Sequence, residues 1–211
     1  MNAEFVFWVV LASYLSLFAE LAFWNVRSVV STWAIWKNER SLVTSFSPKY
    51  RRIFALNRLS KLLCLGIPWF LVIAVFAFPP IASIRYEKYS ESFVFAPNLA
   101  SVAMGTFAVV LGRTITLAAG KRLLGGDSQL CEPLRLETTG IFSFSRNPGL
   151  VGMFLFVAGM WLLLPSPTYG AGILFYVVYM NFKVEMEEDF LANKHGEAYE
   201  KYRLQTKRYF G

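Results

Sequence analysis

The sequence has few of the residues from which metal and redox centres are built. Among its 211 residues are two cysteines, Cys64 and Cys131, and one histidine, His195. The two cysteines lie far apart and lack the paired spacing of a zinc site or a thiol–disulfide motif. Cys64 falls in an apolar run, and Cys131 falls in a segment expected to face the cytosol, where disulfides are rare. We therefore expect no metal centre and no disulfide.

Acidic residues are also scarce, with 14 Asp and Glu against 21 Lys and Arg, for a net charge of +7. The basic residues fall between long uncharged runs, as they do in the cytoplasmic loops of membrane proteins. Hydrophobic residues make up 55% of the chain and the mean hydropathy is +0.43. This composition favours an integral membrane protein surrounded by membrane lipids over a nucleic-acid-binding protein. Nothing in it indicates an obligate protein partner.

The apolar runs predict an all-α fold with five transmembrane helices. Residues 5–24, 62–84 and 97–120 are each long enough to span a bilayer. Residues 147–182 form an uncharged run that is broken only at Pro165-Ser166-Pro167. Such a turn predicts that spans four and five fold into a helical hairpin. In the third span, which Arg113 interrupts, glycines at 105, 112 and 120 offer small surfaces for close helix packing.

The distribution of Lys and Arg predicts the orientation of these spans. Residues 37–61, 121–146 and the segment after 182 are basic, which places all three on the cytoplasmic side. The N-terminus is then outside and the C-terminus cytoplasmic, in a multi-pass protein of the inner (cytoplasmic) membrane. The first run lacks a signal-peptide cleavage pattern and is expected to remain. We expect one domain, 1–211, with three spans in 1–120 and a second part in 121–211.

Polar residues gather where the hairpin leaves the membrane. Asn181, Glu185 and Glu188 recur at i, i+4 and i+7 and should share one helix face. Arg146 precedes Pro148, which is suited to open a helix. Each feature alone is also typical of an ordinary helix exit. Residues 197–209, which mix tyrosines with charges, predict an amphipathic helix on the cytoplasmic membrane surface.

Taken together, four motifs resemble one known family. They are Gly140 to Gly152 with Arg146-Asn147-Pro148, Glu187-Glu188-x-x-Leu191, Gly196-x-x-Tyr199-x-x-Tyr202, and Lys207-Arg208-Tyr209-Phe210. Their order and spacing resemble the C-terminal half of isoprenylcysteine carboxyl methyltransferases and the related phospholipid methyltransferases, over roughly the last 75 residues. Asn147 and Leu150 stand where the family usually has His and Tyr. Asn forms hydrogen bonds but is no imidazole base.

This resemblance implies S-adenosylmethionine as the methyl donor. Arg146 would bind its carboxylate, and Glu187 or Glu188 would accept hydrogen bonds from its amino group or ribose. Glycines would let the cofactor approach the backbone, and Glu188 is the candidate base for an ammonium acceptor. The implied catalytic residues are Arg146 and Glu188, and the implied cofactor-binding residues are Arg146, Asn147, Pro148, Gly149, Gly152, Glu187 and Glu188.

The acceptor is expected to be hydrophobic or lipid-linked and to offer a carboxylate, thiol or amine at the cytoplasmic face. Two alternatives remain open at this point. Membrane sterol reductases carry a similar module and bind NADPH, although they are longer chains. A non-catalytic membrane protein derived from the family would also fit the substitutions at Asn147 and Leu150. The sequence names neither the acceptor nor the oligomeric state.

Overall fold

The fold is seen in a computed structural model, which describes residues 5–6, 8–16, 90–124 and 136–210. Within these residues all regular structure is helical, as expected. The second expected span, the 37–61 basic loop and the inner part of the first span lie outside the described residues. The number of spans therefore stays a prediction, and the description below concerns the bundle that carries the motifs.

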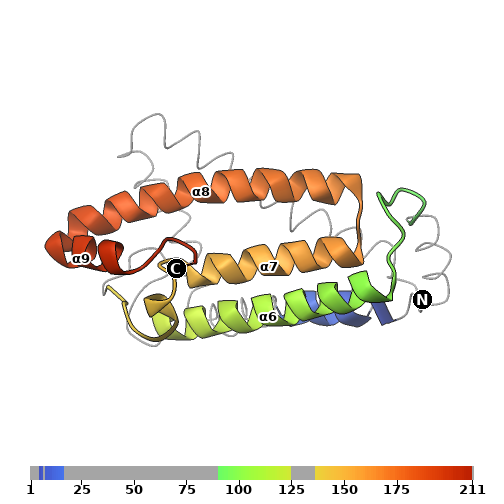
Figure 1. Cartoon of the computed structure of the whole chain (residues 1–211), viewed down its shortest axis with the longest axis horizontal. Helices are drawn as coiled ribbons and strands as arrows, with labels where there is room; N and C mark the ends of the chain where they lie inside the picture. Colours follow the sequence, from blue (N-terminus) through green and yellow to red (C-terminus); the bar gives the residue numbers. More distant parts are fainter. Residues whose placement is uncertain (1–4, 7, 17–89, 125–135, 211) are drawn as a thin grey trace, which may run out of the picture.

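Three long helices lie lengthwise beside one another (Figure 1). They are α6 (Leu99–Leu124), α7 (Pro148–Leu163) and α8 (Pro167–His195). The short 3-10 helix η2 (Gly140–Ser143) precedes α7, and α9 (Glu197–Gln205) folds back at the far end of α8. Residues 8–16 form a further helix whose Val10 and Tyr14 join the buried core. That helix runs alongside the first half of α6.

Glycines bring α6 and α7 into direct backbone contact. A Cβ added at Gly112 would lie 2.5 Å from the Gly152 carbonyl oxygen, and one added at Gly105 would lie 2.8 Å from that of Gly159. Only residues without a side chain permit so close an approach. The expected packing role of the glycines at 105 and 112 is confirmed.

The hairpin is present and turns where the two prolines predict. The Ser166 hydroxyl accepts a hydrogen bond from the Tyr169 amide at 3.2 Å and so caps α8, with Pro167 at its first position. The Trp161 ring nitrogen donates to the Ser166 carbonyl at 3.2 Å. The Val94 amide donates to the Pro165 carbonyl at 2.9 Å, so the connection before α6 lies at the same end of the bundle.

Only one helix in the described part, at Leu99–Leu123 of α6, is long and apolar enough to cross a membrane by length and composition. The 16-residue α7 is apolar but shorter, and α8 is apolar only in its first half. Arg113 of α6 is buried. Its guanidinium donates to the Ser16 hydroxyl at 2.9 Å and the Ser16 carbonyl at 3.1 Å. A charge within a span is expected to face a neighbouring helix in this way rather than lipid.

The end of the chain departs from the expected helix over 197–209. Helix α9 stops at Gln205, and Thr206 is extended with φ −126° and ψ 130°. The tyrosines of α9 point inward: Tyr199 and Tyr202 are buried, and the Tyr202 hydroxyl donates to the Phe142 carbonyl at 2.6 Å. They pack against the protein, which leaves Leu204 as the large apolar side chain exposed on α9.

Candidate functional site

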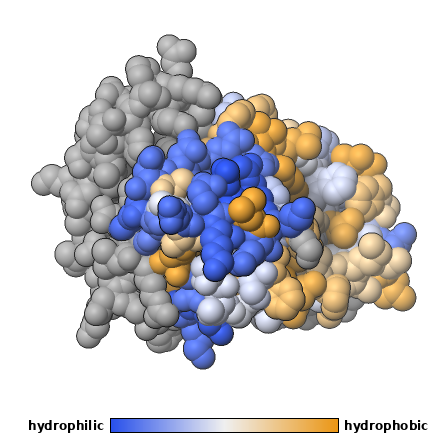
Figure 2. Space-filling model, turned by 60° about the vertical axis from the view of Figure 1, so that its left-hand side comes forward, coloured by the Kyte–Doolittle hydropathy of each residue, from blue (hydrophilic) through white to orange (hydrophobic). Residues whose placement is uncertain are grey.

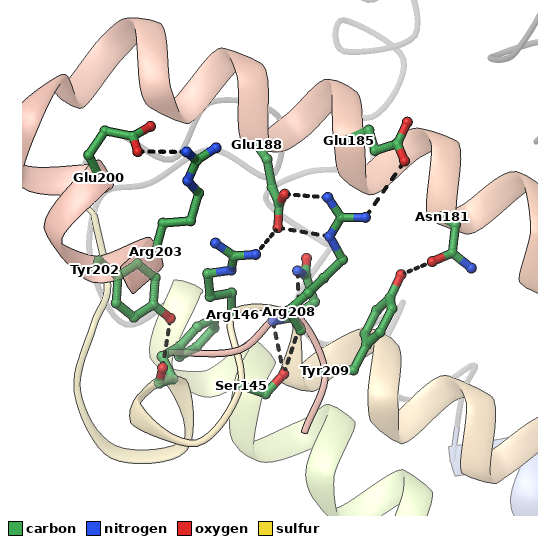
Figure 3. Close-up of polar contacts among 12 residues, drawn as sticks. Ser145, Arg146, Asn181, Glu185, Glu188, Glu200, Tyr202, Arg203, Arg208 and Tyr209 are labelled. Atoms are coloured by element: carbon green, nitrogen blue, oxygen red, sulfur yellow. Dashed lines mark hydrogen bonds and ion pairs between the residues drawn. The ribbon is translucent and has the colours of Figure 1, made fainter. Parts of the chain in front are cut away.

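The candidate site lies at the end of the bundle opposite the Pro165 turn. Four elements meet there: the turn before α7, the second half of α8, helix α9 and the extended residues 206–210 (Figure 3). Figure 2 shows this end as a hydrophilic cluster, next to a flank where hydrophobic side chains gather. Large exposed apolar residues lie along α6 and α8, among them Met104, Phe107, Leu174, Phe175 and Val178.

Glu188 is the centre of the site and binds two arginines. Its Oε1 lies 3.1 Å from Nη2 of Arg146, and both its oxygens accept from Arg208, at 3.2 Å from Nε and 2.7 Å from Nη2. The side chains of Arg146 and Glu188 are only 10% and 11% exposed. The structure thus brings together the two residues named as catalytic from the sequence. Arg208, which lies in the basic motif 207–210, was not among the predicted site residues.

Asn181, Glu185 and Glu188 lie on one face of α8, as expected, and this face contacts residues 206–210. Arg208 reaches Glu188 and also lies 3.7 Å from Glu185. The Tyr209 hydroxyl donates to the Asn181 side-chain oxygen, two turns further along the same face (Figure 3). The amide, the two carboxylates and the extended segment therefore form one connected polar network.

Asn147 has a structural partner on the same segment. Its side-chain nitrogen donates to the Arg208 carbonyl at 3.3 Å, and the Ser145 hydroxyl donates to the same oxygen at 3.1 Å. The Arg146 amide donates to the Lys207 carbonyl at 2.9 Å. The position where the family usually has histidine thus serves here as a hydrogen-bond donor, a role that an amide fills as well as an imidazole.

The remaining predicted cofactor-binding residues lie in different surroundings. Pro148 opens α7 and is buried, and a Cβ at Gly149 would meet only the Ala119 methyl at 3.6 Å. Gly152 faces α6, where a Cβ would lie 2.5 Å from the Gly112 carbonyl. Its missing side chain therefore permits helix packing. Glu187 is half-buried and, as the residue next to Glu188 on α8, points in another direction.

Three buried donors at the site have no hydrogen-bond partner among the described residues. They are Nε and Nη1 of Arg146 and the hydroxyl of Tyr199. A buried polar group without a partner is costly, and its presence in a native fold needs an explanation such as a ligand. Each of these guanidinium nitrogens can donate a charge-assisted hydrogen bond to a carboxylate, as separate donors on different edges of the group. The residues present therefore fit a ligand that carries a carboxylate.

Burial also perturbs the two tyrosines of α9. Desolvation raises the pKa of Tyr199 to about 12, the nearby Glu188 carboxylate adds to this, and Arg146 opposes it. Desolvation likewise raises the pKa of Tyr202 to about 12. Both hydroxyls are neutral donors at neutral pH, and they keep their protons to a higher pH than an ordinary tyrosine, whose pKa is 10.0.

These pKa shifts predict a loss of stability at alkaline pH. The folded state holds its tyrosine protons more tightly than the unfolded state, so the free energy of unfolding falls as the pH rises from 10 towards 12. The contribution is fully present below pH 10. The thermal midpoint, measured between pH 9 and 12, should fall less steeply in Tyr199→Phe than in the wild type. An equal slope in both proteins would show that Tyr199 is not perturbed in this way.

The part of the chain that carries the site is similar to a known protein family. Residues 99–198 match the model of the phospholipid methyltransferase family. This segment, just under half of the chain, is similar to that family. It runs from α6 to the start of α9 and includes Arg146, Pro148 and Glu188, but it ends before Arg208.

A curated relative also has a methyltransferase name. The chain is 34% identical over 71 residues to a Protein-S-isoprenylcysteine O-methyltransferase of Schizosaccharomyces pombe. The alignment covers 32% of this chain and 29% of the yeast protein, so the chain matches less than a third of that relative's length. No solved structure matches the chain. These findings support a methyltransferase, with the phospholipid methyltransferase module in the half that carries the site.

Proposed function

We propose that the chain transfers a methyl group from S-adenosylmethionine to a hydrophobic or lipid-linked acceptor at the cytoplasmic face of the membrane. The observation that carries this proposal is the buried Arg146–Glu188 pair, at 3.1 Å, beside buried donors without partners. The pair lies within the segment matched by the methyltransferase family. The reductase and non-catalytic alternatives gain no support from that match.

In this proposal Arg146 donates to the cofactor carboxylate from Nε or Nη1, the nitrogens left over from its contact with Glu188. The Tyr199 hydroxyl is a further donor for the same end of the cofactor. Glu188 accepts from the cofactor ammonium, and Glu187 accepts from the ribose hydroxyls. Asn147, Pro148 and Gly149 form the turn along which the cofactor lies. Gly152 is left out because it faces α6.

When bound, the cofactor supplies an electrophilic methyl group on a sulfonium, and its transfer neutralises that charge. The protein's contribution is then to align donor and acceptor and to exclude water. Glu188 would remove the proton if the acceptor is an ammonium. The exposed apolar side chains along α6 and α8 fit a lipid-like acceptor that reaches the site from within the membrane.

Five spans with the N-terminus outside and the site in the cytosol complete the proposal. The Pro165 turn and the connection before α6 lie at the same end of the bundle, which fits this arrangement. From that turn α8 returns the chain to the end where Arg146 lies (Figure 1). A cytosolic site agrees with where S-adenosylmethionine is made. Membrane-impermeant labelling of Phe210→Cys in intact and opened cells tests the orientation, since Phe210 is exposed.

Loss of Arg146 should remove methyl transfer. Purified protein in detergent is mixed with a membrane lipid extract and S-adenosylmethionine labelled in its methyl group, and label in the lipid fraction is counted. Arg146→Ala should lower the rate by about a hundredfold or more, since a hydrogen bond between charged groups and the cation that attracts the carboxylate are lost. Arg203→Gln is the matched control, because that exposed arginine pairs with Glu200 at 2.9 Å and lies away from Glu188 in Figure 3. Equal rates in Arg146→Ala and the control would refute the assigned role.

A further inference from the structure

Residues 206–210, here called the strap, cross the site after the end of α9. The strap passes between the turn at Ser145–Asn147 and the polar face of α8 (Figure 3). It lies outside the segment that the family model matches, which ends at residue 198. Residues 207–210 are also the basic motif noted in the sequence, and their contacts place that motif over the site.

The strap is bound at both of its edges. On one side the carbonyls of Lys207 and Arg208 accept three hydrogen bonds, from the Arg146 amide, the Ser145 hydroxyl and the Asn147 side chain. On the other side Arg208 and Tyr209 bind the face of α8. The Tyr209 ring also packs against Phe154 with ring centroids 5.8 Å apart. The strap thereby connects the start of α7 to the exit of α8.

Arg208 occupies the carboxylate that the proposed ligand needs. A carboxylate offers about four lone-pair sites, and Glu188 already uses three of them, two for Arg208 and one for Arg146. The guanidinium of Arg208 is a cation with N–H donors, as is the ammonium of an amino acid. It therefore stands where such an ammonium would bind.

The unpartnered donors of Arg146 and Tyr199 are buried and closed to solvent in this structure. Nε and Nη1 of Arg146 and the Tyr199 hydroxyl are each buried and have no partner among the described residues. A carboxylate outside the protein cannot reach atoms that water does not reach, so part of the covering structure must move for a ligand to bind there. The strap is a non-helical segment that contacts Arg146 directly, and its release would free Glu188 as well.

We propose that the strap is an autoinhibitory segment: Arg208 competes with the ammonium group of an amino-acid-bearing ligand for the Glu188 carboxylate. The inference rests on the proposed function, which supplies such a ligand. The structure is then the closed state, and an ammonium can take the two positions that Arg208 holds on Glu188 only when Arg208 leaves. A binding-competent state that is only partly populated lowers the apparent affinity by its population. Weakening the strap therefore strengthens binding, whereas weakening a true ligand contact has the opposite effect.

Tyr209→Phe tests this directly. The variant removes the hydroxyl that donates to Asn181 but keeps the ring that packs on Phe154, and it leaves Arg146, Glu188 and Arg208 unchanged. The probe is S-adenosylhomocysteine, titrated calorimetrically into the full-length protein in detergent. The loss of one strap hydrogen bond should lower the dissociation constant by about twofold to tenfold. Arg208→Gln should shift it in the same direction, and Arg203→Gln should not shift it.

The outcomes separate this inference from the proposed function. If the wild type binds S-adenosylhomocysteine and Tyr209→Phe binds it equally or more weakly, the autoinhibitory strap is refuted and the cofactor stands. If neither protein binds it, the proposed function fails and this inference fails with it. Hydrogen exchange in the wild type gives a readout without any variant: saturating S-adenosylhomocysteine should speed exchange of the 206–210 amides. Slower exchange there would mean that the strap closes over the ligand, which contradicts competition.

Discussion

Glu188→Ala should both destabilise the protein and abolish binding of S-adenosylhomocysteine. Without this carboxylate, Arg146 keeps a guanidinium that is 10% exposed, with no acceptor among its described contacts. Breaking a buried pair by removal of one partner costs about 3–5 kcal/mol. We expect the lower end of that range, roughly 3 kcal/mol, because Arg208 is one-third exposed and water relieves its charge. Chemical unfolding in detergent and calorimetric titration measure the two effects.

Glu185→Ala is the matched control, because it removes a carboxylate from the same face of α8. Glu185 is 52% exposed and lies 3.7 Å from Arg208, so its loss should change stability little and leave binding intact. If Glu188→Ala and Glu185→Ala behaved alike in both measurements, Glu188 would not be the centre of the site.

Gly152→Leu should separate α6 from α7. Even a Cβ at this position would lie 2.5 Å from both the Gly112 carbonyl oxygen and the Thr116 hydroxyl oxygen, and the Gly112 oxygen is backbone that cannot turn aside. Overpacking of a close contact costs about 1–3 kcal/mol and often more where backbone must shift. We expect a loss of at least about 3 kcal/mol, measured as a lower unfolding midpoint. Methyl transfer should fall with it, because α7 carries the turn of Arg146.

Gly149→Ala is the control for Gly152→Leu, because it also replaces a glycine of α7 but at a position that does not pack closely against α6. Its Cβ would meet only the Ala119 methyl at 3.6 Å, an ordinary contact, and alanine favours a helix by about 1 kcal/mol over glycine. The control should therefore be as stable as the wild type or more so. A stable Gly152→Leu protein would contradict the close crossing of α6 and α7.

The hairpin could be predicted because its causes are local. An uncharged run and two prolines around Ser166 determine where one helix stops and the next begins, and the turn falls there. The same holds for the stripe of Asn181, Glu185 and Glu188, since helical periodicity alone puts them on one face. The hairpin also predicts that Arg146 and Glu188 lie at the same end of the bundle, because it returns the chain to the side it left, whereas their assignment to one site came from the resemblance to a family.

The role of the last residues could not be predicted, because it depends on tertiary contacts. The charges and tyrosines after Gly196 suit an amphipathic helix, but the chain leaves the helix at Gln205 and turns back over the site. Arg208 lies 20 residues from its partner Glu188, and no periodicity relates the two. Gly152 shows the same limit: the resemblance implied a cofactor contact, and its close packing against α6 depends on tertiary structure that the sequence does not show.

The account rests most directly on whether the buried donors around Arg146 bind the cofactor. Calorimetric titration of S-adenosylhomocysteine into the purified wild-type protein and into Arg146→Ala decides this. We expect saturable binding at one site in the wild type and a dissociation constant about a hundredfold higher, or more, in the variant. The absence of binding in the wild type, or equal affinity in both proteins, would contradict the proposed site.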